Sequence, residues 1–273
     1  MFKSVLIIYK PTDKCFEIAR SVGNEFRKHG IHITVYTVND IHRLENENYD
    51  LILSIGGDGT FLKVSRLLQR PLENPLILPY PCGRRNTFYE LPPLGISDIV
   101  ENVLNGVFHV EFYPRLKACI ENSCMYFLNE IAIINANLGK IARYDIKIQS
   151  HSMNSCFSFE GDGVLISSAP GSAAYNLSAD GPLVDFVSNV MIFTPLNPLQ
   201  RDLPSIVIPS ILSKIEILPK ETSHVFVDGE IVDKLKKDTK ILVTGGSNYI
   251  RVIRFEYLRN LVKDIIETRR AVI

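Results

Sequence analysis

The stretch ILSIGGDGTFLK, Ile52 to Lys63, decides the fold of the first part of this chain. An apolar run ends in Gly-Gly-Asp-Gly-Thr, and a helical pattern of apolar residues then begins at Phe61. A buried strand that leads through glycines into a helix is typical of an α/β domain, in which ligands bind beyond the carboxyl ends of the strands. We therefore expect the glycine turn to face a ligand.

The residues on both sides of this turn alternate between strand and helix patterns. Strands are expected in SVLIIYK, IHITVYTV, YDLILSI and NPLILPYP, and helices in CFEIARSVGNEFRKHG and FLKVSRLLQR, the second ending before Pro71. Such repetition implies right-handed crossovers. The sequence therefore predicts a Rossmann-like α/β domain with a mostly parallel sheet over residues 1–108.

The pattern changes after this first part. Short β-rich segments punctuated by Gly, Pro and Asn, such as ARYDIKIQS, GVLISSA and KIEILP, predict an all-β domain over residues 109–250. Residues 251–273 begin like a strand and continue as a helical run, LRNLVKDIIETRR. We expect this last segment to return to the first domain.

Composition limits the class of protein. The 273 residues include 30 basic and 30 acidic side chains, so no overall charge attracts nucleic acid or an anionic membrane. The apolar run Val5–Tyr9 is too short for a signal peptide or a membrane span, and we expect a cytoplasmic protein. The five cysteines show no C-x-x-C pair and the histidines no metal-ligand spacing, which predicts thiols in a reducing compartment and no metal site in the protein itself.

Asp58 is the unusual residue of the glycine turn. Exposed N–H groups around Gly57 and Gly59 suit phosphate oxygens, although neither common phosphate-loop spacing occurs. A carboxylate there would repel phosphate unless it handles a proton or a Mg²⁺ ion, and both tasks belong to phosphoryl transfer. The alternative is that Asp58 caps the following helix and the glycines only make a tight turn.

A second group of residues lies in FEGDGVLISSAPGSAAYNLSADGPLV, Phe159 to Val184. It contains Asp162-Gly163 and a run of small residues from Ser167 to Ala174, which would let a flat ligand lie against the backbone. Tyr175 and Ser178 would then supply directional hydrogen bonds. The alternative is a glycine- and serine-rich surface loop before a short helix.

Together these motifs resemble the NAD kinase family, which uses ATP or polyphosphate. The resemblance rests on GGDGT at Gly56–Thr60, Asn129-Glu130 in FLNEIAI, the GDGVLISSAPGSAAYNLSADGP segment and VDGE at Val227–Glu230. It implies two domains with the active site between them, a homodimer or homotetramer, and transfer of a phosphoryl group to the adenosine-ribose 2′-hydroxyl of NAD. Mg²⁺, or another divalent cation, is expected from the phosphoryl-transfer chemistry.

The resemblance also implies roles for single residues. Asp58 would activate the 2′-hydroxyl, Asn129 and Glu130 would bind the adenosine part, and Asp162 would orient the nicotinamide end. Gly57 and Gly59 would hold phosphates, Thr60 and Lys63 would bind nucleotide, and Ala174, Tyr175 and Ser178 would line the dinucleotide site. Independently of the resemblance, Arg84 and Arg85 suit bidentate binding of donor phosphates, with a solvated turn as the alternative.

The chain departs from the family pattern in several places. Pro170 and Ala173 replace threonines, Asp180 replaces a glycine, and Pro198-Leu199 stands where Pro-His is usual. The segment PYPCGRRNTFYEL departs furthest, and its spacing resembles that of diacylglycerol-type lipid kinases. A lipid kinase and a catalytically silent NAD-binding sensor therefore remain as alternatives.

Overall fold

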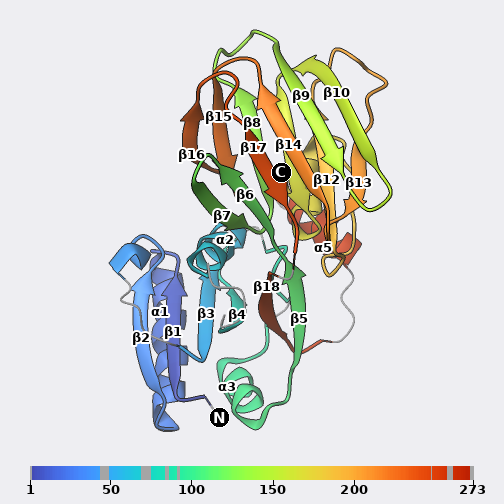
Figure 1. Cartoon of the computed structure of the whole chain (residues 1–273). Helices are drawn as coiled ribbons and strands as arrows, with labels where there is room; N and C mark the ends of the chain where they lie inside the picture. The colour runs from blue at the N-terminus through green and yellow to red at the C-terminus, as the bar shows by residue number, and fades with distance from the viewer. Residues whose placement is uncertain are drawn as a thin grey trace. The chain divides into compact units, whose positions relative to one another are not determined.

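The computed structural model describes residues 2–43, 49–68, 75–83, 86–90, 93–246, 248–256 and 261–270. The chain divides into two compact units, one of Met1–Phe112 with Ile250–Ile273 and the other of Tyr113–Tyr249 (Figure 1). The second unit is therefore an insertion in the sequence of the first.

The first unit is built on a six-stranded sheet in the order β2-β1-β3-β4-β18-β5. Strand β1 pairs in parallel with β2 and β3, and β4 pairs in parallel with β3 and β18, which confirms the predicted α/β domain with its mostly parallel sheet. The strands are β1 (Ser4–Tyr9), β2 (His32–Thr37), β3 (Leu51–Gly56), β4 (Leu76–Pro81), β5 (His109–Pro114) and β18 (Tyr249–Arg254).

Helices α1 (Asp13–Lys28) and α3 (Ile96–Asn105) share one hydrophobic core with this sheet. In α1 the buried face is Cys15, Ala19, Val22, Gly23 and Phe26, the spacing expected of an amphipathic helix. The other helices are α2 (Asp58–Leu67), α5 (Leu261–Arg270) and the 3₁₀ turn Ile41–Arg43. No described helix is both long and apolar enough to cross a membrane.

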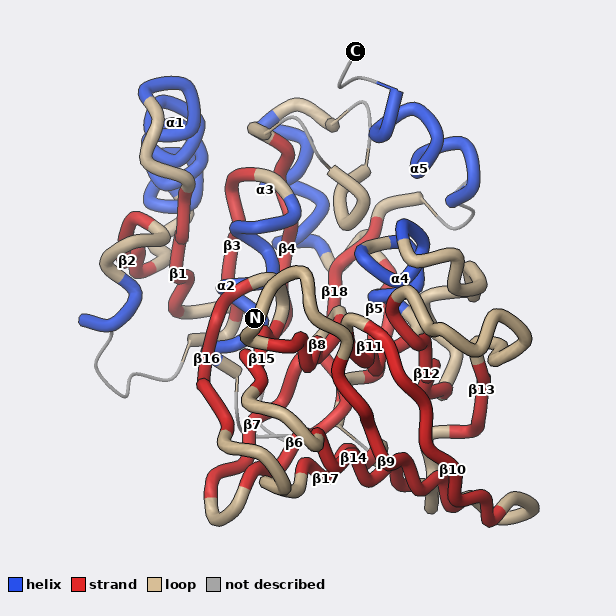
Figure 2. The backbone as a smooth tube through the Cα atoms, turned by 90° about the horizontal axis from the view of Figure 1, so that it is seen from above, coloured by secondary structure: helices blue, strands red, loops and turns tan. Residues whose placement is uncertain are grey.

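The second unit consists mainly of strands (Figure 2). They form two antiparallel sheets, β10-β9-β14-β17-β6-β7 and β13-β12-β11-β8-β15-β16, which share one apolar core and confirm the predicted all-β domain. The strands are β6 (Leu116–Ile120), β7 (Ser123–Phe127), β8 (Glu130–Asn135), β9 (Ala142–Gln149), β10 (Asn154–Gly161), β11 (Gly163–Ser168), β12 (Val190–Leu196), β13 (Ile206–Pro209), β14 (Lys214–Pro219), β15 (Ser223–Val227), β16 (Glu230–Leu235) and β17 (Ile241–Thr244). The 3₁₀ turn Pro170–Ala173 and the short helix α4 (Tyr175–Ser178) follow β11.

The cysteine prediction is wrong for four of the five residues. Cys15 in the first turn of α1 forms a disulfide with Cys82, which directly follows β4. Cys119 and Cys124 are cross-strand partners in the β6–β7 hairpin and form a second disulfide. The first pair is separated by 67 residues, and only the fold brings its members together. Cys156 is an exposed free cysteine.

Candidate functional site

The Gly-Gly-Asp-Gly-Thr turn joins the buried strand β3 to α2. Gly57 is the N-cap residue of α2 and Asp58 is the first helical residue. A side chain at position 56 would collide with the Thr60 side chain, which folds back over Gly56. At Gly59, in contrast, a side chain would meet no atom within 4 Å. Internal packing therefore explains the glycine at position 56, whereas the space beside Gly59 is open.

Asp58 does not cap α2, because Gly57 occupies the cap position and the cap makes no side-chain hydrogen bond. The Asp58 carboxylate instead accepts a hydrogen bond from the backbone N–H of Phe88, with 3.2 Å between N and Oδ1. The side chain is half-buried. The capping alternative is therefore wrong, and the carboxylate is held from the segment after β4.

A hollow of about 940 Å³ opens at this turn. Its lining residues belong to the first unit and are Lys10, Pro11, Lys14, Val38, Asn39, Gly57, Asp58, Gly59, Thr60, Lys63, Cys82 and Gly83. Five of the predicted residues, 57–60 and 63, thus meet in one place. Three lysines against one aspartate give the lining a net positive charge, which favours an anionic ligand. Arg84 and Arg85 lie outside the described residues.

Lys10 and Lys14 were not predicted. Lys10 directly follows β1, and Lys14 lies in the first turn of α1. Both occupy the carboxyl edge of a parallel sheet, where the sequence analysis expected ligands to bind. That rule, applied to the first strand as well as to the third, would have found them.

In the second unit, Glu130 is the first residue of β8 and Asn129 directly precedes it, and both are buried. The pKa of Glu130 is raised to about 8, mainly by burial and to a smaller extent by the nearby charge of Asp228. A hydrogen bond from the Tyr175 backbone N–H lowers this pKa but does not offset the two raising causes. Asp228 itself accepts hydrogen bonds from the backbone N–H groups of Leu128 and Asn129, the second at 2.7 Å. Glu130 is therefore mostly protonated at neutral pH.

The small-residue run packs against the chain itself. A side chain on Gly171 would collide with the Asn129 carbonyl group, and the Ser168 hydroxyl donates to the Leu128 carbonyl oxygen. The buried Asn176 amide donates to the Pro182 carbonyl oxygen at 2.9 Å. Gly171 and Ser168 are thus small because neighbouring backbone lies against them, and the flat ligand stays a prediction.

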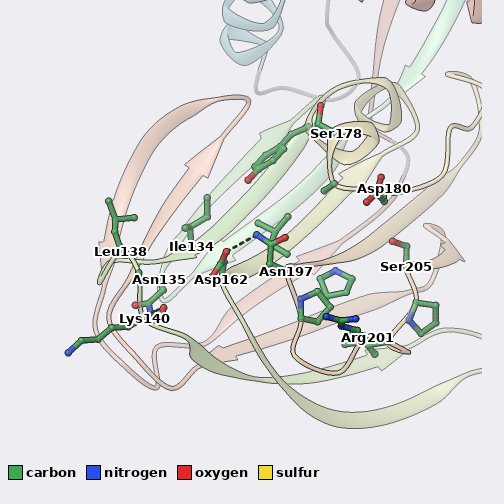
Figure 3. A pocket seen from close by; sticks show the side chains of 18 of the residues that line it. Ile134, Asn135, Leu138, Lys140, Asp162, Ser178, Asp180, Asn197, Arg201 and Ser205 are labelled. Carbon is green, nitrogen blue, oxygen red and sulfur yellow. Dashed lines mark hydrogen bonds between the residues drawn. The ribbon is translucent and has the colours of Figure 1, made fainter.

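A pocket of about 660 Å³ lies in the second unit. It brings together the predicted Asp162, Tyr175 and Ser178, whereas Asn129, Glu130 and Ala174 are absent from its described lining. Asn197, which follows β12, donates a hydrogen bond to the Asp162 carboxylate at 2.7 Å (Figure 3). Asp180, noted above as a departure from the family pattern, also lines this pocket. Other lining residues that the sequence analysis missed are Asn135, Lys140 and Arg201, which lie in turns or at strand ends and carry no motif.

Among the described residues, no three His, Cys, Asp or Glu side chains gather as a metal site. A single carboxylate in a cationic hollow still fits Mg²⁺, because this ion is commonly bound through one or two carboxylates together with substrate phosphates. Asp58 is the carboxylate of that kind in the first unit's hollow.

Comparisons with known proteins match both parts of the chain. Residues 8–108 match the ATP-NAD kinase N-terminal domain and residues 128–255 the ATP-NAD kinase C-terminal domain. An NAD kinase of Methanopyrus kandleri is 34% identical over 76% of this chain and 73% of its own length, and one of Aeropyrum pernix is 29% identical over 92% of both.

Two solved structures share the fold. An NAD kinase from Archaeoglobus fulgidus in complex with ATP superimposes with a TM-score of 0.78 at 21% identity, over 97% of this chain and 99% of the other. Yeast NADH kinase complexed with NADH gives a TM-score of 0.80 at 20% identity, over 97% and 87%. Both domain matches and the relative from Methanopyrus kandleri lead to one conclusion: the chain belongs to the NAD kinase family.

Proposed function

We propose that this phosphotransferase moves the terminal phosphoryl group of ATP or polyphosphate to the adenosine-ribose 2′-hydroxyl of NAD, with Asp58 as the general base. The observation that carries the proposal is the position of the Asp58 carboxylate, half-buried in a hollow lined by Lys10, Lys14 and Lys63. The carboxylate accepts the hydroxyl proton while the oxygen attacks the phosphorus.

The donor phosphates bind beside the glycine turn in this proposal. The open space at Gly59 admits a phosphate close to the backbone, and the first N–H groups of α2 favour its negative charge. Thr60 and Lys63 lie in the first two turns of the same helix and add a hydroxyl and a cation. Arg84 is a further donor ligand in this proposal. Mg²⁺, held by Asp58 and the phosphates, would neutralise charge on the transferring group.

The acceptor NAD binds to the second unit in this proposal. Asn129 Oδ1 and Glu130 Oε2 are buried and have no hydrogen-bond partner among the described residues, so polar atoms of the adenosine part can satisfy them. Asp162, held by Asn197, orients the nicotinamide end. Tyr175 and Ser178 line the same pocket as Asp162, and Ala174 precedes them at the start of α4.

The test is a coupled assay for NADP formation from NAD with Mg²⁺ and either ATP or polyphosphate, repeated with NADH as acceptor. Turnover with either donor supports the proposal and identifies the donor. Measurable NAD binding without turnover would favour the silent sensor, and failure to bind NAD would favour the lipid kinase. Light scattering on the same preparation tests the proposed homodimer or homotetramer.

A further inference from the structure

Two consecutive residues after β4 hold two consecutive residues of the glycine turn. The Phe88 backbone N–H donates to the Asp58 carboxylate at 3.2 Å, and the Tyr89 hydroxyl donates to the Gly57 carbonyl oxygen at 3.0 Å. Both donors belong to PYPCGRRNTFYEL, the segment that departs furthest from the family pattern. The departure therefore falls on one residue that contacts the proposed base and on one that contacts the glycine before it.

The Tyr89 hydroxyl is buried and has one proton to give. Its proton goes to the Gly57 carbonyl, so the Ser54 hydroxyl at 3.4 Å is left to donate to the Tyr89 oxygen. Tyr89 is only 1% exposed, and burial raises its pKa well above the ordinary value. The hydroxyl therefore remains a donor throughout the pH range of an enzyme assay.

Aromatic packing fixes the Tyr89 ring independently of its hydroxyl. Phe61 of α2 stacks on Phe88 with 4.6 Å between ring centroids and meets Tyr89 edge-on at 6.3 Å. All three rings are almost fully buried. Removing the hydroxyl alone should therefore leave the ring in place.

We propose that Tyr89 is a positioning residue that sets the direction of the Asp58 carboxylate through the Gly57 carbonyl. The Gly57 carbonyl oxygen also accepts from the backbone N–H groups of Thr60 and Phe61, at 2.8 and 3.2 Å, so Tyr89 is a third donor to the peptide that carries Asp58. Rotation of the Gly57–Asp58 peptide would move the carboxylate and weaken the Phe88 contact. This inference rests on the proposed role of Asp58. It differs from a role in stability alone, because its effect reaches the reaction only through that carboxylate.

The test compares Tyr89→Phe with Ser54→Ala, the matched control that removes the other hydroxyl of the same contact. We expect Tyr89→Phe to lower kcat about tenfold to a hundredfold, the scale of a small displacement of a reacting group, with KM for NAD unchanged. The kcat ratio to the unmodified enzyme should stay constant with pH. Ser54→Ala should retain kcat. An unchanged kcat in Tyr89→Phe would overturn the proposal, as would an equal loss in Ser54→Ala.

A double-mutant cycle separates positioning from stability. In an Asp58→Asn background, Tyr89→Phe should change kcat by less than about twofold, because the group it positions is already gone. An equal loss in both backgrounds would show a structural role only and overturn the inference. Asp58→Asn can turn over too slowly for this comparison. In that case, a rise in KM for NAD that accompanies the fall in kcat of Tyr89→Phe would likewise show a structural role and overturn the inference. Full turnover of Asp58→Asn alone would instead remove the proposed base itself.

Discussion

The two units each contain an aspartate whose carboxylate accepts hydrogen bonds from backbone N–H groups, but in different surroundings. In the first unit, the backbone N–H of Phe88 holds the carboxylate of Asp58. In the second, the carboxylate of Asp228 accepts from the backbone N–H groups of Leu128 and Asn129, which directly precede β8. Asp58 is half-buried and lines a hollow, whereas Asp228 is only 8% exposed.

The difference shows what burial decides for an acidic residue. A carboxylate held by the backbone at an open surface keeps acceptor sites for a ligand or a proton. A buried carboxylate that satisfies backbone donors is committed to the fold, and its loss leaves those donors unsatisfied. The contrast predicts that substitution of Asp58 changes turnover, and that substitution of Asp228 changes stability.

The largest expected effect is on turnover in the first unit. Asp58→Asn should lower kcat by about 10² to 10⁴, the range for loss of a general base, because an amide cannot accept the hydroxyl proton. The amide oxygen still accepts from Phe88, so the thermal midpoint should stay near that of the unmodified protein. The coupled assay and a melting curve measure the two quantities. A kcat of Asp58→Asn equal to that of the unmodified protein would refute the role of Asp58 as general base.

The two disulfides give the next contrast. Chain entropy predicts that the Cys15–Cys82 link, which spans 67 residues, stabilises its unit by about 4 kcal/mol, and the Cys119–Cys124 link, which spans 5, by about 2 kcal/mol. The double variants Cys15→Ala/Cys82→Ala and Cys119→Ala/Cys124→Ala are matched controls for each other. Urea unfolding followed by circular dichroism suits a chain without tryptophan. Equal losses, or the reverse order, would contradict the prediction.

Glu130 should make stability fall with rising pH. Its pKa is about 8 in the folded state, raised by burial and the Asp228 charge, against an ordinary value of 4.5. Between pH 4.5 and 8 the folded state keeps the Glu130 proton, whereas the unfolded state has lost it. The contribution of the protonated Glu130 to stability is therefore complete below the unfolded pKa and is lost by about pH 8. Glu130→Gln should remove a decline of roughly 3 kcal/mol between pH 5 and 8. Parallel pH profiles for both proteins would exclude the effect.

The smallest effect completes the comparison between the two aspartates. Asp228→Asn should destabilise the second unit by about 2 kcal/mol, since its amide keeps one acceptor oxygen and loses the charge that strengthens both hydrogen bonds. Denaturant unfolding measures this loss, with Asp58→Asn as the control. A loss of stability in Asp58→Asn as large as in Asp228→Asn would erase the distinction between the two units.

The glycine turn could be predicted because its residues are contiguous and the strand–helix alternation around them is strong. Helix α3 was missed although Ile99, Val100 and Val103 give it an apolar face and Gly106, at φ 71°, ends it. Strand β10 was missed because much of it is exposed. The contacts of Asp228 with residues 128 and 129 could not be predicted, because they cross about a hundred positions and depend on strand pairing.

The inserted second unit has a consequence for the order in which this protein matures on the ribosome. Strand β18, which pairs with β4 through Arg251 and Val252, is translated only after the whole of residues 113–249. Until then the growing first unit presents an open β4 edge, a template for pairing with other nascent chains. The inserted unit contains both of its own sheets and can fold before the sheet that precedes it is closed.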